Sequence, residues 1–113
     1  MDVVVRGRRD RVGEQDRARL ERKLSRLSRL DGRIDRVEVE VTFETRGRIG
    51  GGHRVEASCR SGRRVFRASA TGPDVEAAVD RLTARLERQI VEDHRRRRNR
   101  LSGGRDRVQS ART

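Results

Sequence analysis

RVEVEVTFE, residues 36–44, alternates strictly between apolar and polar side chains, and this alternation decides the fold. Successive side chains of a β-strand point to opposite faces, so the pattern predicts a strand with one buried and one wet face. The buried face would carry Val37, Val39, Val41 and Phe43, and the wet face Glu38, Glu40 and Thr42. The strand therefore belongs to a sheet that is covered on one side only.

Two further strands are predicted after this one, at 53–60 and 63–71, with Ser61-Gly62 between them. A two-residue connection containing glycine is typical of a tight β-hairpin, so these strands should pair antiparallel. Their inward positions would be Val55, Ala57, Cys59, Phe66, Ala68 and Ala70. The glycine-rich stretch 45–52, TRGRIGGG, predicts a flexible connector between the quoted strand and the hairpin.

The residues before the quoted strand predict a strand and then a helix. Three β-branched valines at 3–5 favour a short strand. From Gly13 the apolar period changes to that of a helix reaching about Leu30, and Asp31-Gly32 would end it. Its apolar side carries Leu20, Leu24 and Leu27.

The residues after the hairpin predict a long helix. Pro73 would be its first residue, because the missing N–H of proline is unpaired at that position in any case. One apolar stripe follows at helical spacing: Val75, Val79, Leu82, Leu86 and Ile90. This period is lost beyond Arg98, so we expect one domain over residues 1–100 and a flexible basic tail over 101–113.

The predicted order is β-α-β-β-β-α. A strand, a helix and a second strand imply a parallel pair joined by a right-handed crossover, and the hairpins that follow are antiparallel. Each helix has one apolar stripe, so both should pack on one face of a four-stranded mixed sheet, an α+β fold. The other face would meet solvent, with opposite charges paired across strands among Glu38, Glu40, Arg54, Glu56, Arg60 and Arg67.

Composition points to a polyanionic partner. The 113 residues include 30 Lys and Arg against 18 Asp and Glu, a net charge of +12, and all the basic residues but Lys23 are arginine. Arginine grips phosphate through two parallel hydrogen bonds. The two aromatic residues, Phe43 and Phe66, are both predicted to point inward, so binding should be led by phosphate rather than by base stacking.

Several other classes of protein are not expected. A single cysteine, Cys59, excludes an internal disulfide, and His53 and His94 are far apart and lack partner ligands, so no metal site and no cofactor are expected. The glycines before His53 are not followed by Gly-Lys-Ser/Thr, and no base accompanies a nucleophile at motif spacing, so we expect no catalytic residues and no enzyme. No run of about 18 apolar residues occurs, so a cytoplasmic protein without membrane contact is expected.

The positive charge is sorted on both predicted helices. With 100° per residue, the first helix carries an outward stripe opposite its leucines: Arg19, Arg22, Arg26 and Arg29. The second carries arginines on one flank of its apolar stripe and acids on the other: Arg81, Arg85, Arg88 and Arg95 against Glu76, Asp80 and Glu87. Two such stripes predict a basic surface with a groove between the helices, continued by Arg95, Arg96, Arg97 and Arg98.

Both helices resemble those of the ribosome hibernation-promoting factors, including the ribosome-associated inhibitor A type. Residues 74–97, DVEAAVDRLTARLERQIVEDHRRR, are similar to the family's signature, in which an Asp precedes two apolar-alanine positions and a DxLxxKLxRQ run. The matching residues are Asp74, Ala77, Ala78, Asp80, Leu82, Leu86, Arg88 and Gln89, with Arg85 in place of the lysine. The first helix resembles the family's KLxKLxK helix through Lys23, Leu24, Arg26, Leu27 and Arg29.

This resemblance implies a partner and a function. The partner would be the small ribosomal subunit, its 16S rRNA and the whole ribosome, with the chain competing for the channel of mRNA and of A- and P-site tRNA. The consequence would be inhibited translation and preserved idle ribosomes under stress or in stationary phase. The resemblance implies rRNA contacts at Lys23, Arg26, Arg29, Arg85, Arg88 and Arg95. The helical wheels add Arg22 and Arg81, and the arginine run adds Arg96, Arg97 and Arg98.

Two alternatives stay open at this point. A general binding module for double-stranded or structured RNA also stacks helices on one face of a small sheet, but in the order α-β-β-β-α, without the leading strand at 3–5. A related protein could also modulate the ribosome without blocking it. The chain resembles the short form of the family, which lacks the C-terminal ribosome-dimerising domain, so it should not dimerise ribosomes by that route. The chain itself is expected to be a monomer. It departs from many relatives in having Gly13 where they carry a Ser or Thr cap.

Overall fold

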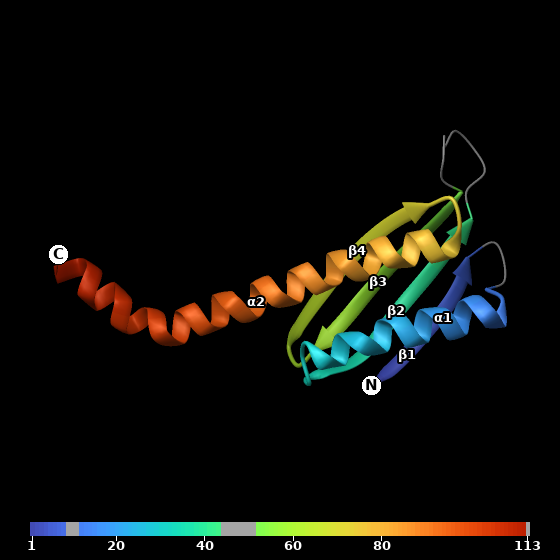
Figure 1. Cartoon of the computed structure of the whole chain (residues 1–113). Helices are drawn as coiled ribbons and strands as arrows, with labels where there is room; N and C mark the ends of the chain where they lie inside the picture. Colours follow the sequence, from blue (N-terminus) through green and yellow to red (C-terminus); the bar gives the residue numbers. More distant parts are fainter. Residues whose placement is uncertain (9–11, 44–51, 113) are drawn as a thin grey trace.

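The predicted order of elements is confirmed in a computed structural model of the chain (Figure 1), which describes residues 1–8, 12–43 and 52–112, with side chains up to residue 100. The elements are β1 (Asp2–Arg8), α1 (Glu14–Ser25), the 3-10 helix η1 (Arg26–Arg29), β2 (Ile34–Phe43), β3 (His53–Ser61), β4 (Arg64–Gly72) and α2 (Val75–Arg112). The connector predicted at 45–52 lies outside the described residues except for Gly52.

The four strands form one mixed sheet in the order β1-β2-β3-β4. β1 and β2 are parallel, with Val5 opposite Val39, and the two remaining pairs are antiparallel, with Val39 opposite Ala57 and Ala57 opposite Ala68. α1 connects the parallel strands, and both helices lie side by side on the same face of the sheet (Figure 1). The α+β fold with two helices on one face is therefore confirmed.

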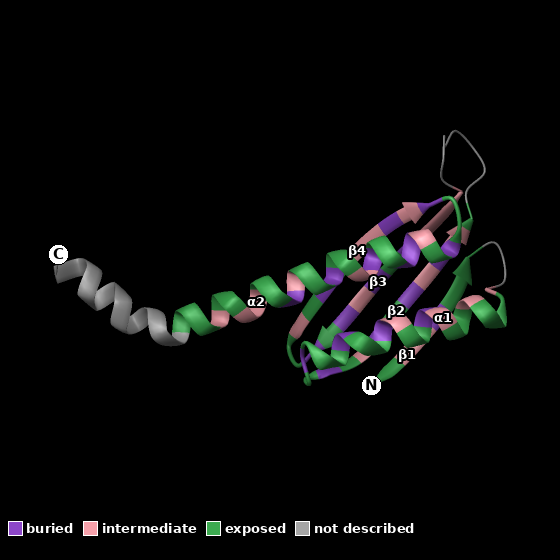
Figure 2. Ribbon diagram, in the orientation of Figure 1, coloured by how far each residue is buried: buried purple, intermediate pink, exposed green. Residues whose placement is uncertain are grey.

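The core lies between this face and the two helices. The alternation in the quoted stretch holds for Val37, Val39 and Val41, which are all buried. Helix side chains of the predicted stripes complete the core: Leu20, Leu24, Leu27, Val75, Val79, Leu82, Leu86 and Ile90. Figure 2 shows buried segments in both helices and along the strands of the sheet.

Phe43 is the exception to the alternation. It was expected to point into the core with Phe66, but its side chain is 42% exposed, whereas Phe66 is buried. Phe43 is the last residue of β2, and its ring meets that of His53, the first residue of β3, edge to face at a centroid distance of 4.9 Å. The prediction failed because an inward position at the end of a strand need not be covered by a helix.

The connections around β4 depend on glycine and on a capping aspartate. The hairpin between β3 and β4 turns at Gly62-Arg63, one residue later than predicted, and Gly62 has the positive φ of +61° that favours glycine. Pro73 was wrongly placed as the first helical residue. The N-cap of α2 is Asp74, whose carboxylate Oδ1 accepts a hydrogen bond from the Ala77 N–H at 2.8 Å.

The first helix is shorter than predicted. α1 ends at Ser25, and the chain continues as the 3-10 helix η1. The hydroxyls of Ser25 and Ser28 donate to the carbonyls of Glu21 and Ser25, and such side-chain bonds compete with regular helical hydrogen bonding. Leu27 stays fully buried on η1, so the tighter turn keeps the apolar stripe directed at the core.

The second helix is longer than predicted. The sequence pattern placed its end near Arg98, whereas the backbone of α2 is helical to Arg112, because no proline interrupts this stretch. The last buried side chain described on α2 is Ile90, and at 1.5 Å per residue the rest of the helix is about 33 Å long. Figure 1 shows it projecting beyond the sheet. The domain boundary at residue 100 and the flexibility of 101–113 stay predictions.

The face of the sheet opposite the helices, which we call the open sheet face, carries both signs of charge. Two ion pairs cross between strands, Arg8 with Glu40 at 3.6 Å and Arg60 with Asp35 at 3.0 Å. Two others join residues two apart on one strand, Arg36 with Glu38 and Arg54 with Glu56. Exposed pairs of this kind contribute about 0–1 kcal/mol each. Their balance means that the excess positive charge of the chain lies mostly elsewhere.

Candidate nucleic-acid interface

The seam between α1 and α2 is a line of ion pairs. Arg19 of α1 lies 3.3 Å from Glu76 of α2, and Lys23 pairs with Asp80 one turn later. A small hollow of about 180 Å³ follows along the seam, lined by Lys23, Arg26, Asp80, Thr83, Ala84 and Glu87. The acidic flank of α2 thus faces the basic stripe of α1. The predicted basic groove between the helices is wrong, because the seam carries both signs.

The opposite flank of α2 lies along the free edge of β4. Arg81 donates to the Thr71 carbonyl at 2.6 Å, Arg85 donates to the Ser69 carbonyl, and the Gln89 side-chain amide donates to the Arg67 carbonyl at 2.7 Å. Four residues of helix rise about 6 Å and two residues of strand about 6.8 Å, so the two spacings nearly match. These three side chains, the edge ladder, cover carbonyls that an edge strand would otherwise present to another chain.

The edge ladder separates the predicted arginines into two groups. Arg81 and Arg85 are exposed but bonded to β4, on the side of α2 away from α1. The predicted binding residues that are exposed, and have no ion pair or hydrogen bond to another described side chain, are Arg22, Arg26, Arg29, Arg88, Arg95 and Arg96. The structure therefore places one cationic group on the outer side of α1 and η1, and another along α2.

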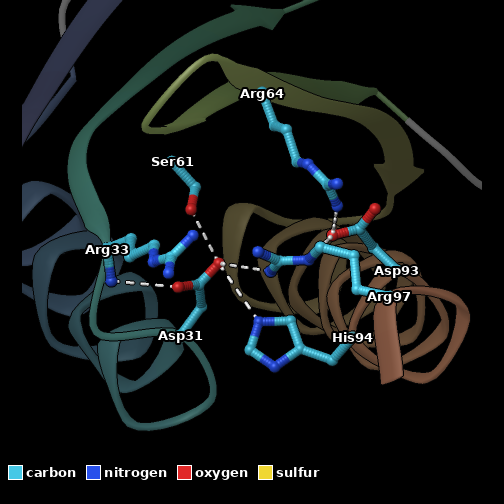
Figure 3. Close-up of polar contacts among 7 residues, drawn as sticks. All are labelled: Asp31, Arg33, Ser61, Arg64, Asp93, His94 and Arg97. Atoms are coloured by element: carbon cyan, nitrogen blue, oxygen red, sulfur yellow. Dashed lines mark hydrogen bonds and ion pairs between the residues drawn. The ribbon is translucent and has the colours of Figure 1, made fainter. Parts of the chain in front are cut away.

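A buried carboxylate holds the end of the sheet to α2 (Figure 3). Asp31 is only 3% exposed. Its Oδ1 accepts the Arg33 backbone N–H at 2.9 Å, and its Oδ2 accepts the Ser61 hydroxyl at 2.7 Å. The same oxygen lies 3.3 Å from His94 Nε2 and 4.0 Å from the Arg97 guanidinium, both on α2. Asp31 thereby connects the turn after η1, the β3–β4 hairpin and the distal part of α2.

A second carboxylate extends this arrangement. Asp93, on α2, pairs with Arg64 at the start of β4 and lies 3.2 Å from Nε of Arg97. Arg97 therefore bridges two acids and is half-buried, as Figure 3 shows. Arg97, one of the four arginines predicted to continue the basic surface, is therefore already paired within the protein. We call the whole group the Asp31 cluster: Asp31, Ser61, Arg64, Asp93, His94 and Arg97.

Ionisation in this region follows from burial and hydrogen bonding. Burial alone would raise the pKa of Asp31, but hydrogen bonds from the Ser61 hydroxyl and the Arg33 N–H, together with His94, outweigh it and lower the pKa below its ordinary value. The carboxylate is therefore charged at neutral pH. By contrast, burial raises the pKa of the Cys59 thiol to about 11, so this side chain is an unreactive core residue.

A hollow of about 510 Å³, the distal hollow, opens beside the Asp31 cluster. Its lining consists of Asp31, Arg33, His94, Arg97, Arg98 and Arg100. Four guanidinium groups thus surround one carboxylate that is already hydrogen-bonded. Basic side chains thus converge on a concavity here, which brings together Arg97 and Arg98 of the predicted set.

Sequence reasoning missed the role of Asp31 and of its partners. Asp31 precedes a glycine after a helix, a context typical of an exposed turn residue, and Ser61 was treated only as part of a hairpin. No local signal reveals the buried contact, because it depends on three elements far apart in the sequence. His94 was expected to be an ordinary surface histidine but is half-buried against Asp31.

The described residues contain neither a candidate metal site nor a candidate membrane-spanning helix. No group of three or more His, Cys, Asp or Glu side chains within residues 1–8, 12–43 and 52–100 is arranged to hold a metal ion. No helix in the described part of the chain is both long enough and apolar enough to span a membrane.

Known proteins share this architecture. A ribosomal subunit interface protein from Coxiella burnetii superimposes with a TM-score of 0.72 at 20% sequence identity, covering 83% of this chain and 98% of that one. The N-terminal domain of Protein Y from Thermus thermophilus superimposes with a TM-score of 0.68 at 25% identity, covering 80% of this chain and 96% of that one. No curated protein sequence matches the chain significantly.

The sequence itself matches a family description over nearly all of the folded region. The match to the sigma 54 modulation protein / S30EA ribosomal protein family extends over residues 3–98, from β1 to the arginine run on α2. It includes α1, β2, β3 and β4 in full, β1 from Val3 and α2 as far as Arg98. The chain belongs to the sigma 54 modulation protein / S30EA ribosomal protein family.

Proposed function

We propose that this protein is a ribosome hibernation factor. It binds 16S rRNA of the small ribosomal subunit in the channel for mRNA and for A- and P-site tRNA, inhibits translation, and preserves idle ribosomes under stress or in stationary phase. It acts in the cytoplasm as a monomer and needs no cofactor and no catalytic step. Family membership and a fold shared with a ribosomal subunit interface protein support a ribosomal partner.

The observation that carries the proposal is the uneven distribution of charge. On the open sheet face four arginines pair with acids, whereas the chain from His94 onward contains eight arginines and one aspartate. α2 carries this charge about 33 Å beyond the core. A basic helix that extends beyond a domain with a second basic helix face can contact phosphate groups on more than one side, as in a channel through folded RNA.

The proposed rRNA-binding side chains differ in whether they already have a partner within the protein. Some of these side chains have no partner among the described residues and could bind phosphate without breaking a described contact: Arg22, Arg26, Arg29, Arg88, Arg95 and Arg96. Lys23, Arg81, Arg85 and Arg97 also belong to the proposed surface, but each would have to share or exchange its present partner. Arg98 lines the distal hollow. We therefore expect the first group to dominate the electrostatic part of binding.

The test compares two double variants with equal change of charge. Arg88→Gln/Arg95→Gln removes two unpaired cations from α2, and Arg6→Gln/Arg67→Gln removes two from the open sheet face. Affinity for small ribosomal subunits is measured across a salt series. Each lost phosphate contact lowers the slope of log K against log salt by about one, so the α2 variant should lose about two units. Equal slopes for both variants would remove α2 from the interface.

A further inference from the structure

The distal hollow has the features of a built anion site. Three of its arginines, Arg97, Arg98 and Arg100, come from about one turn of α2, and Arg33 faces them from the turn before β2. These two segments are far apart in the sequence and are held together by Asp31, which bonds the Arg33 N–H and lies against His94 and Arg97. The buried contacts of Asp31 therefore fix the backbone segments that carry these arginines relative to each other.

The charge of the hollow is only partly neutralised from within. Asp31 is the carboxylate in its lining, both of its oxygens already accept hydrogen bonds, and Arg97 is paired with Asp31 and Asp93. Within the described part of the chain, the guanidinium groups of Arg33 and Arg100 have no ion pair or hydrogen bond. An anion entering the hollow thus meets at least two arginines whose donors are available.

Two buried nitrogens in the wall also lack a well-aligned acceptor. His94 Nε2 lies 3.3 Å from Asp31 and Arg97 Nε lies 3.2 Å from Asp93, but neither meets hydrogen-bond geometry with any described group. Each of these nitrogens nevertheless faces a carboxylate oxygen, so the wall beside the hollow is held by charge contacts between buried groups.

The chemistry of the lining selects phosphate. Arginine presents its N–H groups as a planar fork that matches two oxygens of one phosphate. Every side chain in the lining is charged or polar, and His94 is the one aromatic ring among them, so recognition would be led by the oxyanion. A volume of about 510 Å³ is ample for one phosphate or two linked phosphates with their water.

We propose that the distal hollow is a phosphate-binding site, with Arg33 and Arg100 as its ligands and Arg97 and His94 in its wall. The phosphate could belong to an RNA backbone or to a free diphosphate. This deepens the proposed function, because in the first case the hollow would seat one particular phosphate of the RNA.

The experiment titrates the full chain with inorganic pyrophosphate near 150 mM salt and follows amide shifts by NMR. Wild type should show saturable shifts at residues 31–34 and 94–100, and Arg33→Gln/Arg100→Gln should weaken pyrophosphate binding about tenfold or more. The matched control, Arg6→Gln/Arg67→Gln, should bind like wild type. Shifts that rise linearly without saturation, or equal weakening in both variants, would overturn the site. All three proteins are compared by thermal unfolding, and these exposed arginines should leave the midpoint unchanged.

Two further arms identify the source of the phosphate and separate this inference from the proposed function. If the hollow seats RNA, Arg33→Gln/Arg100→Gln will also lose affinity for small subunits relative to the control variant, and pyrophosphate will compete with subunits for wild type. If it takes a free diphosphate, subunit affinity will equal that of the control. If the wild-type chain binds pyrophosphate saturably but does not bind small subunits, the phosphate site is upheld and the hibernation function is refuted.

Discussion

Replacing Asp31 by Asn should destabilise the fold far more than its place in a turn would suggest. The substitution keeps the size and shape of the side chain but removes its negative charge. It leaves the Ser61 hydroxyl and the Arg33 N–H with a weaker acceptor, and it can place an amide N–H beside His94 and Arg97. Three elements that meet at this carboxylate would therefore lose part of their connection.

The magnitude follows from burial and the number of partners. Loss of a charged acceptor in a buried network costs about 1–3 kcal/mol for Asn, and Asp31→Ala, which removes the acceptor altogether, about 3–5 kcal/mol. The pKa of Asp31 is lowered in the folded state, so its ionised form favours folding. This stability is fully present above the ordinary value of 3.8 and is lost as the pH falls through the lower folded pKa. The gap between wild type and Asp31→Asn should accordingly narrow below about pH 4.

The assay is urea unfolding at pH 7 and near pH 3, with Asp35→Asn as the matched control. Asp35 is also an ionised partner of an arginine, Arg60, but both side chains are exposed, so its loss should change stability little. If Asp31→Asn and Asp35→Asn are equally stable at pH 7, or if the Asp31→Asn gap does not depend on pH, then Asp31 does not hold these elements together.

Three other variants each test one feature of the fold. Removing the edge ladder with Arg81→Ala/Arg85→Ala/Gln89→Ala should expose the β4 edge and produce concentration-dependent association in sedimentation velocity, whereas a variant that stays monomeric would show that the ladder is dispensable. Asp74→Ala should lower the free energy of unfolding by about 1 kcal/mol through loss of the α2 cap, and an unchanged denaturation midpoint would refute that role. Gly62→Ala should cost about 1–2 kcal/mol because φ is +61°, and a thermal midpoint equal to wild type would mean that the hairpin relaxes without strain.

The order of strands and helices could be predicted because it depends on local periodicity. Alternation at 36–44 and the leucine spacing of the helices are properties of short segments, and the buried residues follow them closely. Phe43 shows the limit of this reasoning. Its place in the alternation of β2 is that of an inward-facing residue. Whether a helix extends far enough to cover it depends on the tertiary structure.

The candidate interface was less predictable than the fold. Helical wheels sorted the charges correctly around each axis, but they do not say which flank of α2 faces α1. In the fold, the acidic flank faces α1 through Glu76 and Asp80, and the basic flank faces the β4 edge, so the expected basic groove is a mixed seam. The Asp31 cluster and the distal hollow depend on contacts between distant segments, which no wheel or motif includes.

The most direct test of the central claim is co-sedimentation of the purified protein with small ribosomal subunits near 150 mM salt. It is done with and without excess mRNA plus initiator tRNA, and beside a random RNA duplex. We predict saturable binding of one copy per subunit that is lost when mRNA and tRNA are added, with weak binding to the duplex. Equal binding to the duplex, or binding to subunits that ignores mRNA and tRNA, would contradict a channel-blocking hibernation factor and indicate a general RNA-binding module.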